Sequence, residues 1–353
     1  MFDVDNEWVY GKNKNWKTRF ETNVTNSLPV ISGITVNNGV NYYTTDIPNK
    51  TEVFKDSLTI STRGEYSGTV TYHKGEFLLA NNILVMNMPE LTLKQKLFIG
   101  ALINSLPYGG YSGYPRKETL KDDVIKLPIK DGKIDFNFMK SLISELEEER
   151  ISELSAYLKV SRLDSYELSD EEKQALEDFN NIKWKEYNLE KLFGKATRGR
   201  RLKSQDRIKG VLPFVTAGEA NTGISDFIGN DVKIFNKNTI TIDMFGSAKY
   251  RNYNYGCDDH IAVVHTENLK MEESIFITSA IHKTSYNGQF NYGRNFYAKD
   301  ADTLNILLPI NEKGIDYDFM NSLISAVQKL IIKEVVIYAD EKIKTTKKVV
   351  RKD

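Results

Sequence analysis

The sequence has almost no cysteine: Cys257 is the only thiol in 353 residues. One cysteine excludes an internal disulfide and a metal site built from several thiolates, which is typical of a reducing compartment. No apolar run reaches the roughly eighteen residues that a membrane-spanning helix needs, and the start, MFDVDNEWVYGKNK, has neither a basic segment nor an apolar core. We therefore expect a cytoplasmic protein without membrane contact.

The sequence also lacks net charge, because 48 lysines and arginines balance 48 acidic residues. A protein that coats nucleic acid indiscriminately carries a large positive excess, so this class is disfavoured. The 40% hydrophobic and 27% charged residues are ordinary for a globular protein, and the length suffices for two domains. Charge can still be concentrated locally, so its distribution matters more than its sum.

Catalytic motifs are absent as well. The sequence contains no nucleophile elbow, zinc-protease HExxH, P-loop, dinucleotide-binding glycine pattern or Pro-Pro-aromatic motif of amino-methyltransferases. His260 and His265 flank one expected strand at a spacing that places them on opposite faces. The stretch CDDH, Cys257 to His260, has metal-ligand residue types but lies at an expected turn without further ligands. We expect neither a catalytic residue nor a metal site nor a cofactor in this chain.

What the sequence does contain is an internal repeat. The phrase IDFNFMKSLIS (134–144) returns as IDYDFMNSLIS (315–325). Three further pairs follow the same order, namely SLPVISG (27–33) with VLPFVTAG (211–218), DSLTISTRGEYSG (56–68) with NTITIDMFGSAKY (238–250), and LFIGALINSLPYGGYSGYPRK (97–117) with IFITSAIHKTSYNGQFNYGRN (275–295). The halves differ greatly elsewhere, which indicates one scaffold that carries two different surfaces.

Each half predicts a mixture of strands and helices. Short β-branched segments bounded by Gly, Asn or Asp, such as DSLTIST, GTVTYH, NILVMNM, NTITIDMF and HIAVVHT, are typical of strands. LTLKQKLFIGALINSL (91–106) has helical spacing of apolar residues. The expected fold class is therefore α+β, as two pseudo-repeated domains separated by long helices.

The repeated phrase begins a long helix in each half, after an Asp suited to N-capping. About 25 residues of helix extend about 37 Å. The two apolar stripes are expected to pack together as an antiparallel coiled coil and to present partner-binding surfaces. Their residues are Met139, Ile143, Leu146 and Leu154 in the first helix, and Met320, Ile324, Val327 and Ile331 in the second.

These patterns predict four segments: a first domain (1–133), a helical spacer (134–175), a second domain (176–314) and a C-terminal long helix (315–353). Ser169 and Glu172 form a capping-box pattern within the spacer. Matching Trp8 with Trp184 leaves fewer residues before Pro29 than before Pro213. We therefore expect the first domain to be shortened at its N-terminus and to lack a counterpart of the basic loop that follows Trp184.

That basic loop, GKATRGRRLKSQDRIKG (194–210), holds only one acidic residue. Its cations can neutralise phosphates, which supply much of the affinity of a nucleic-acid binder. The alternative is a solvated loop without a ligand. The candidate DNA-binding residues here are Lys195, Arg198, Arg200, Arg201 and Lys203.

Basic and aromatic residues also recur in two loops of each half. Arginine can bind guanine through two hydrogen bonds, and glycine lets a backbone approach a partner closely. Singly these loops could be structural turns, but their recurrence with altered polar residues favours two DNA-reading surfaces. The candidates are Arg63, Tyr66, Lys74, Tyr114, Arg116 and Lys117 in the first half and Lys249, Arg251, Tyr292 and Arg294 in the second, where Tyr114 and Arg116 are matched with Tyr292 and Arg294.

The order of WKEYNLEKLF, a basic loop, LPFVTAG, NTITIDMFGSA, YNGQFNYGRN, LLPI and a long helix resembles the target recognition domains of specificity subunits in Type I and related, BcgI-like Type IIB, restriction-modification systems. The resemblance implies two domains that bind double-stranded DNA. It also implies partner methyltransferase (modification) subunits, which carry S-adenosylmethionine, and in systems that cut DNA a restriction subunit.

On this interpretation each half recognises one part of a bipartite DNA site and the long helices set the spacing. Their expected length, about 37 Å, is close to one turn of B-DNA, about 34 to 36 Å. Two other functions stay open at this point. One is an enzyme whose motifs are unfamiliar, and the other is a protein-binding adaptor in which only the coiled coil is functional.

Overall fold

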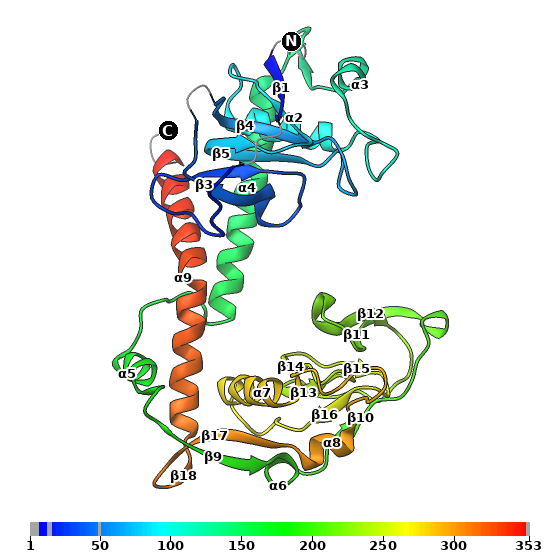
Figure 1. Ribbon diagram of the computed structural model, residues 1–353, viewed down its shortest axis with the longest axis vertical. Helices are drawn as coiled ribbons and strands as arrows, with labels where there is room; N and C mark the ends of the chain where they lie inside the picture. The colour runs from blue at the N-terminus through cyan, green and yellow to red at the C-terminus, as the bar shows by residue number, and fades with distance from the viewer. Residues whose placement is uncertain (1–6, 13–15, 49–50, 351–353) are drawn as a thin grey trace. The chain divides into compact units, whose positions relative to one another are not determined.

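The computed structural model describes residues 7–12, 16–48 and 51–350, with the backbone alone for 345–350 (Figure 1). The chain divides into two compact units, Met1–Leu154 and Ser155–Asp353. Each unit contains both strands and helices, so the α+β prediction is confirmed. Among the described residues, no helix combines the length and the apolar character that crossing a bilayer requires.

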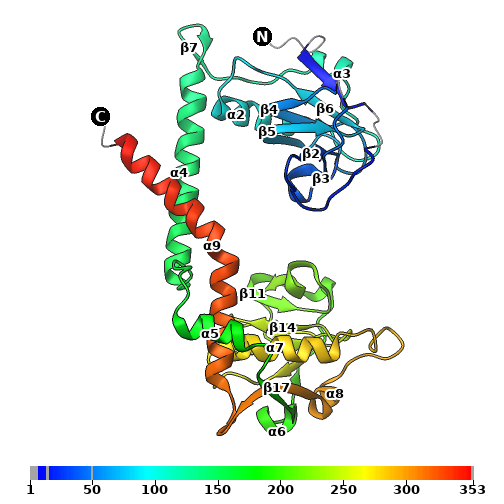
Figure 2. The same cartoon turned by 60° about the vertical axis from the view of Figure 1, so that its left-hand side comes forward.

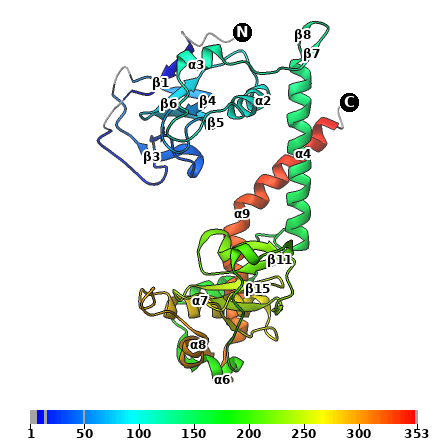
Figure 3. The ribbon, with the colours of Figure 1, turned by 90° about the vertical axis from the view of Figure 1, so that its right-hand side faces the viewer.

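The first unit is built on a six-stranded sheet with the order β1-β6-β4-β5-β2-β3. Helix α2 packs on β4 and β5 (Figure 3), where Gly100 lets the helix approach Leu58 closely. The elements are β1 (Trp8–Tyr10), β2 (Leu28–Ile31), η1 (Asn37–Gly39), β3 (Val40–Thr44), β4 (Phe54–Ser61), β5 (Val70–Leu79), β6 (Ile83–Met86), α2 (Leu93–Asn104), α3 (Lys117–Asp122), β7 (Ile129–Lys130), β8 (Lys133–Ile134) and most of α4 (Phe136–Val160), whose last turns belong to the second unit.

The second unit holds a four-stranded sheet, β10-β16-β13-β14, and two three-stranded sheets, β12-β11-β15 and β18-β17-β9. Helix α7 packs against β14 and α9 (Figure 2). The elements are α5 (Asp170–Asp178), β9 (Lys183–Asn188), α6 (Leu189–Phe193), β10 (Thr197–Arg198), η2 (Ser204–Asp206), β11 (Lys209–Val215), η3 (Ala220–Gly223), β12 (Ile224–Ile228), β13 (Thr239–Ile242), β14 (Ala248–Arg251), β15 (Gly256–Cys257), β16 (Ala262–Val264), α7 (Met271–Ser285), α8 (Ala298–Thr303), β17 (Asn305–Asn311), β18 (Gly314–Ile315) and α9 (Tyr317–Val350).

The strand pairing aligns the two units residue by residue. Strand β1 pairs with β6 as β10 pairs with β16, with Tyr10 opposite Leu84 and Arg198 opposite Ala262. Trp8 therefore corresponds to Ala196, and the expected match of Trp8 with Trp184 was wrong. Gly11 and Gly199 therefore occupy matching positions. The structure describes only part of the segment that follows Gly11, so the expected lack of a basic-loop counterpart in the first unit stays a prediction.

One strand of the second unit has no counterpart among the described residues of the first. Strand β9 pairs with β17 along 305–310 and leaves Ile306 and Leu308 fully buried. In the first unit the described residues place no strand along the matching edge, 124–129. Ile125 and Leu127, which occupy the matching positions, are only half-buried.

Both long helices begin as the repeated phrase predicts. The Asp135 carboxylate accepts the N–H of Phe138 at 2.8 Å, and the Asp316 carboxylate accepts the N–H of Phe319 at 3.0 Å. Helix α4 has 25 residues, as expected, whereas α9 has 34. Helix α9 therefore extends about 51 Å, longer than the sequence pattern predicted.

Helix α5 joins α9 through a polar cluster. The capping box is confirmed, since Ser169 and Glu172 exchange hydrogen bonds at the start of α5. The Glu172 carboxylate also accepts hydrogen bonds from Lys329 Nζ at 2.8 Å and Ser325 Oγ at 2.5 Å, both on α9. This cluster fixes the first half of α9 to its own unit.

Candidate nucleic-acid interface

In each unit, the loop between the two central strands packs against the loop that follows the covering helix. Ser67 Oγ donates to the Gly110 carbonyl at 2.8 Å in the first unit. In the second unit Ser285 Oγ donates to the Gly246 carbonyl at 2.6 Å, and the Phe296 N–H donates to the Met244 carbonyl at 2.8 Å. We call the combined surface of these two loops, 62–69 with 107–116 and 243–247 with 286–297, the loop surface of each unit.

The first loop surface brings most of its predicted residues together. Arg63, Tyr66 and Arg116 are exposed, and their side chains form no ion pair within the described part of the chain. Tyr114 is half-buried, and Lys117 lies with Nζ 6.0 Å from the centre of the Tyr10 ring. Lys74 is exposed further along β5 and does not belong to the loop surface.

The second loop surface is anchored by its own aromatic and charged residues. Tyr292 is 85% exposed, with its ring edge-on to Phe245 at 5.2 Å. Arg294 is also exposed, but its guanidinium forms an ion pair with Asp300 and lies 5.2 Å from the Phe290 ring. Tyr292 is therefore available to a ligand, whereas Arg294 holds the base of the loop.

The predicted match of Arg116 with Arg294 was wrong. Arg116 immediately precedes α3, and its N–H donates to Thr119 Oγ1 at 2.9 Å. Tyr297 has the same place before α8, with its N–H donating to Asp300 at 2.8 Å. Helix α7 has 15 residues and α2 has 12, whereas the loops that follow them, 105–116 and 286–297, are equally long, so an ungapped sequence match slipped by three residues.

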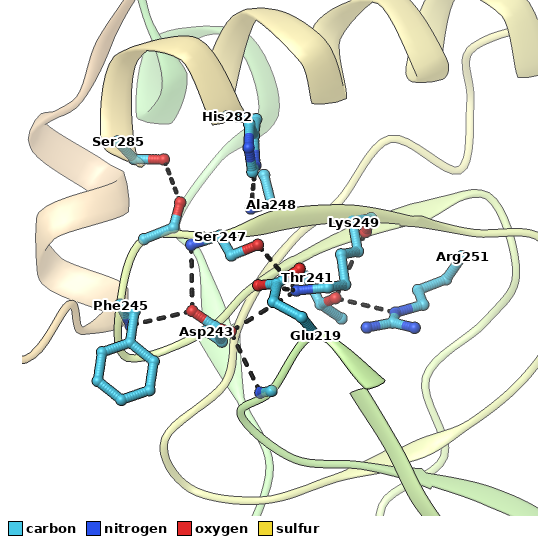
Figure 4. Close-up of polar contacts among 12 residues, drawn as sticks. Glu219, Thr241, Asp243, Phe245, Ser247, Ala248, Lys249, Arg251, His282 and Ser285 are labelled. Carbon is cyan, nitrogen blue, oxygen red and sulfur yellow. Dashed lines mark hydrogen bonds and ion pairs between the residues drawn. The ribbon is translucent and has the colours of Figure 1, made fainter. Parts of the chain in front are cut away.

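A buried carboxylate shapes the short loop of the second unit (Figure 4). Asp243 is 3% exposed and accepts the N–H groups of Phe245 at 2.9 Å and Ser247 at 3.1 Å. Lys249 Nζ lies 3.6 Å from this carboxylate and donates to Glu219 at 3.2 Å. Burial raises the pKa of Glu219, but hydrogen bonds from Ser247 and Lys249 outweigh it, and the net pKa is lowered. The charge of Lys249 is thus largely neutralised within the unit.

Arg251, a predicted DNA-binding residue, is buried at 1% exposure. Its Nε donates to Thr241 Oγ1 at 2.9 Å (Figure 4). Its Nη1 donates to Tyr253 Oη, also at 2.9 Å. The described residues offer it no carboxylate within ion-pair distance. In this conformation Arg251 is inaccessible to DNA, and it supports the surface above it.

The first unit has His73 at the position of Arg251. Each lies in the central hairpin, opposite Ser57 in one unit and Thr239 in the other. His73 Nε2 lies 2.9 Å from Thr59 Oγ1. This contact corresponds to the hydrogen bond between Arg251 and Thr241 in the second unit. Burial lowers the pKa of His73 to about 4, so it is neutral at physiological pH. One buried site thus holds a charged side chain in one unit and a neutral one in the other.

The basic loop exposes the cations that the sequence clusters there. Its exposed cations form no ion pair within the described residues, and they are Lys195, Arg198, Arg200, Arg201 and Lys203. Arg207 closes the loop, with Nη1 donating to Ser225 on β12 at 3.2 Å. In the first unit Arg19 lies 4.7 Å from the Tyr42 ring on β3. Arg19 was not among the predicted residues, because the sequence match aligned Trp8 with Trp184 instead of Ala196.

The remaining polar candidates have contacts within the second unit. His282 Nδ1 accepts the N–H of Ala248 at 3.2 Å, and His265 lies between Thr197 at 2.8 Å and Glu267 at 2.9 Å. Burial raises the pKa of Cys257 to about 12, so its thiol is unreactive at neutral pH. Asp258, Asp259 and His260 cluster at a surface turn, where His260 contacts Asp259 at 3.2 Å.

The two units share one fold, and each exposes basic and aromatic side chains on its loops. Together they define a duplicated DNA-recognition protein. Residues 6–156 and 181–336 match the family described as Type I restriction modification DNA specificity domain. The chain therefore belongs to this family and carries two copies of the domain.

One relative and two solved structures are similar to this chain. The chain is 23% identical over 314 residues to the specificity subunit S.BcgI of a type II restriction enzyme from Heyndrickxia coagulans, covering 87% of this chain and 88% of that one. The S subunit of a Type I restriction-modification system from M. genitalium is 15% identical, with a TM-score of 0.56 over 97% of this chain and 90% of that one. The HsdS subunit from Thermoanaerobacter tengcongensis matches at 11% identity over 95% and 91% of the chains, with a TM-score of 0.31.

Proposed function

We propose that this chain reads a bipartite double-stranded DNA target, with one half-site for each unit, inside a cytoplasmic restriction-modification complex. The observation that carries the proposal is the repeated loop surface, which has the same supports in both units but different loop lengths and side chains. A stable scaffold alone would not require such differences. The chain itself contributes recognition, and methyl transfer with S-adenosylmethionine belongs to the partner modification subunits.

The exposed cations and aromatic rings are the proposed contacts to DNA. Phosphate contacts from the basic loop would supply affinity, and loop-surface residues would supply base contacts. These residues are Arg63, Tyr66, Lys74, Tyr114, Arg116 and Lys117 in the first unit, and Lys195, Arg198, Arg200, Arg201, Lys203 and Tyr292 in the second. Lys249, Arg251 and Arg294 are assigned to positioning these surfaces, because each is neutralised or buried.

The long helices are the proposed spacer and docking surface. Met139 and Met320 are buried, whereas Leu146 and Val327 are exposed and Ile331 is 73% exposed. Exposed apolar residues on a helix are typical of a protein–protein interface. We propose that these helices form an antiparallel coiled coil that also binds the modification subunits, with domain limits at 1–133, 134–175, 176–314 and 315–353.

The test combines a methylation map with the salt dependence of binding. The full chain, reconstituted with its modification subunits, should methylate a bipartite motif with a fixed gap in a random double-stranded DNA library. Arg200→Ala with Arg201→Ala should weaken binding and reduce the slope of log K against log salt concentration by about one for each phosphate that the protein no longer neutralises. Lys313→Ala, an exposed cation in the turn between β17 and β18, is the control and should change neither.

Two results would contradict the proposal. Absence of sequence-dependent binding in the complete complex would favour the adaptor function, in which the helices alone matter. Methyl transfer by the isolated chain would instead identify an enzyme.

A further inference from the structure

Each unit contains a turn with two consecutive residues in the left-handed conformation. The turn joins β2 to β3 in the first unit and β11 to β12 in the second. In the first unit Asn37 has φ 49° and Asn38 φ 52°, and in the second Asn221 has φ 48° and Thr222 φ 54°. Left-handed conformations are uncommon outside glycine and are exceptional for a β-branched residue such as Thr222. Such strained positions persist where the surroundings enforce them, and they concentrate at ligand-binding sites.

The two turns share one frame. The N–H of Ser32 donates to the Gly39 carbonyl at 2.9 Å, and the N–H of Thr216 donates to the Gly223 carbonyl at 2.8 Å. Gly223 is required, because a Cβ there would lie 2.8 Å from the Thr216 carbonyl oxygen at a φ of 82°. The same strained geometry in two otherwise divergent units therefore belongs to the scaffold.

The buried side chain of the central hairpin, His73 in the first unit and Arg251 in the second, lies beneath each turn. A Cβ placed on Gly39 would lie 3.6 Å from His73 Cε1, and one on Gly223 would lie 3.7 Å from Arg251 Nη2. Lys249 reaches the same place through its hydrogen bond to Glu219, which directly precedes η3 (Figure 4). The turn is thus fixed to the central strands in both units.

The side chains of the turns point outward and have little to bind within the protein. Asn37, Asn38, Asn221 and Thr222 are all exposed. The side chains of Asn221 and Thr222 form no hydrogen bond within the described residues, and the Asn37 amide makes one long contact of 3.4 Å to the Val40 carbonyl. The Asn38 amide donates one hydrogen bond, to the Tyr72 carbonyl at 3.2 Å, and its oxygen accepts none within the described residues. An amide held on a rigid turn with free donors and an acceptor can form two hydrogen bonds with an adenine edge.

Basic side chains lie directly beside the turns. Arg207 donates to Ser225 on β12, immediately after η3, and its charge is partly offset by the Asp226 carboxylate at 3.9 Å. Arg19 lies over the Tyr42 ring on β3, immediately after η1. The buried charge of Arg251 beneath the second turn has no carboxylate partner among the described residues and adds positive potential there. The turns therefore lie within the cationic surface of each unit.

We propose that these two turns are specificity-determining elements, in which Asn37 and Asn38 read bases of one half-site and Asn221 and Thr222 read bases of the other. This inference rests on the proposed function as a DNA-reading subunit. The frame is the same in both turns, while the second residue changes from Asn to Thr and the residue at the entrance changes from Thr35 to Glu219. Two different half-sites require such a change of side chains on an unchanged backbone.

The test removes each amide and keeps the backbone. Asn221→Gly and Asn37→Gly delete the side chain at positions where glycine adopts the left-handed conformation freely. The complete complex with each variant is assayed on a random double-stranded DNA library by sequencing the methylated products. Each variant should lose discrimination by about 5- to 150-fold at one or two base pairs of a single half-site, and the two variants should affect opposite half-sites.

Asp131→Gly is the matched control, because Asp131 is exposed with φ 50° in the β7–β8 turn, outside the proposed surface. The complex with Asp131→Gly should keep the wild-type discrimination at both half-sites. Thermal unfolding of all three variants should match that of the wild type.

If the folded variants keep full discrimination at every base pair, or lose affinity uniformly for all sequences, the assignment of base reading to these turns is overturned. A wild-type complex that shows no bipartite preference would instead defeat the proposed function itself.

Discussion

One buried residue position distinguishes the two units electrostatically. His73 and Arg251 occupy the same place in the central hairpin and contact equivalent threonines. A neutral imidazole leaves the first turn without a charge beneath it, whereas the guanidinium places a permanent cation beneath the second. We therefore expect phosphate attraction, and with it salt sensitivity, to be greater for the second unit.

The low pKa of His73 makes the first unit sensitive to acid. The folded-state pKa is about 4, whereas a histidine in the unfolded chain has a pKa near its ordinary value of 6.5. Below pH 6.5 the unfolded chain therefore binds a proton first, and stability falls until the pH reaches about 4. The full effect is on the order of 3 kcal/mol. His73→Gln should remove this part of the pH dependence, because glutamine can still contact Thr59 but does not titrate.

Urea unfolding at pH 7 and pH 4.5 measures this effect by tryptophan fluorescence. A Trp184→Phe background leaves only Trp8 and Trp16, which are both buried in the first unit. His260→Gln, a partly exposed histidine of the second unit, is the control and should leave the pH dependence unchanged. Equal pH dependence in His73→Gln and wild type would show that His73 does not titrate as its burial implies.

At the scale of elements, the sequence predicted the features that depend on residues close together along the chain. The N-caps Asp135 and Asp316, the capping box at Ser169, and the alternating strands β4 and β13 all follow from local patterns, and all are present. The prediction failed where the structure depends on distant pairing or on helix length. The partner of β1 is β6, and no local pattern identifies it.

The candidate surface was also predicted correctly only where local sequence determines it. The exposed basic loop and the pairing of loop 62–69 with loop 107–116 agree with where the sequence clusters basic and aromatic residues. The burial of Arg251 and the neutralisation of Lys249 depend on three-dimensional neighbours such as Thr241 and Asp243, and composition cannot show them. The left-handed turns were missed because Asn-Asn-Gly and Asn-Thr-Gly are short and differ at the second residue.

The attachment of α5 to α9 should depend on one carboxylate. Glu172 is 7% exposed and accepts hydrogen bonds from Lys329, Ser325 and the backbone of Ser169. Burial raises its pKa, but these bonds outweigh burial and the net pKa is lowered. Its stabilisation is therefore present above the unfolded pKa and is lost as the pH falls through the folded pKa. Glu172→Gln should destabilise the second unit by about 1.5 to 3 kcal/mol at pH 7 and by much less in acid.

Urea unfolding of the variant at pH 7 and pH 3 measures the difference. Asp170→Asn is the control, because that carboxylate is in the same helix but is 97% exposed in its pair with Lys173. It should have no measurable effect, since exposed ion pairs contribute little. A Glu172→Gln variant as stable as the wild type at pH 7 would mean that the cost of burying the charge cancels its hydrogen bonds.

At the scale of the whole molecule, one domain occurs twice and each copy ends in a long helix. The family match covers both copies, and each helix starts with the same capped phrase. Recognition can therefore diverge in the loops while the helices stay alike. On the proposed function, the helices set the number of unspecified base pairs between the half-sites.

The length of α4 should then determine the gap. Four alanines inserted after Glu149, in an exposed charged stretch of α4, add about 6 Å of helix and slightly more than one helical turn. At about 3.4 Å per base pair, the gap in the methylated motif should lengthen by about two base pairs, with both half-sites unchanged. Sequencing of a methylated random library measures the gap directly. Replacement of Glu147–Arg150 by four alanines, which preserves the length, is the control and should keep the original gap. An insertion variant that methylates both half-sites at the original gap would exclude α4 as the spacer.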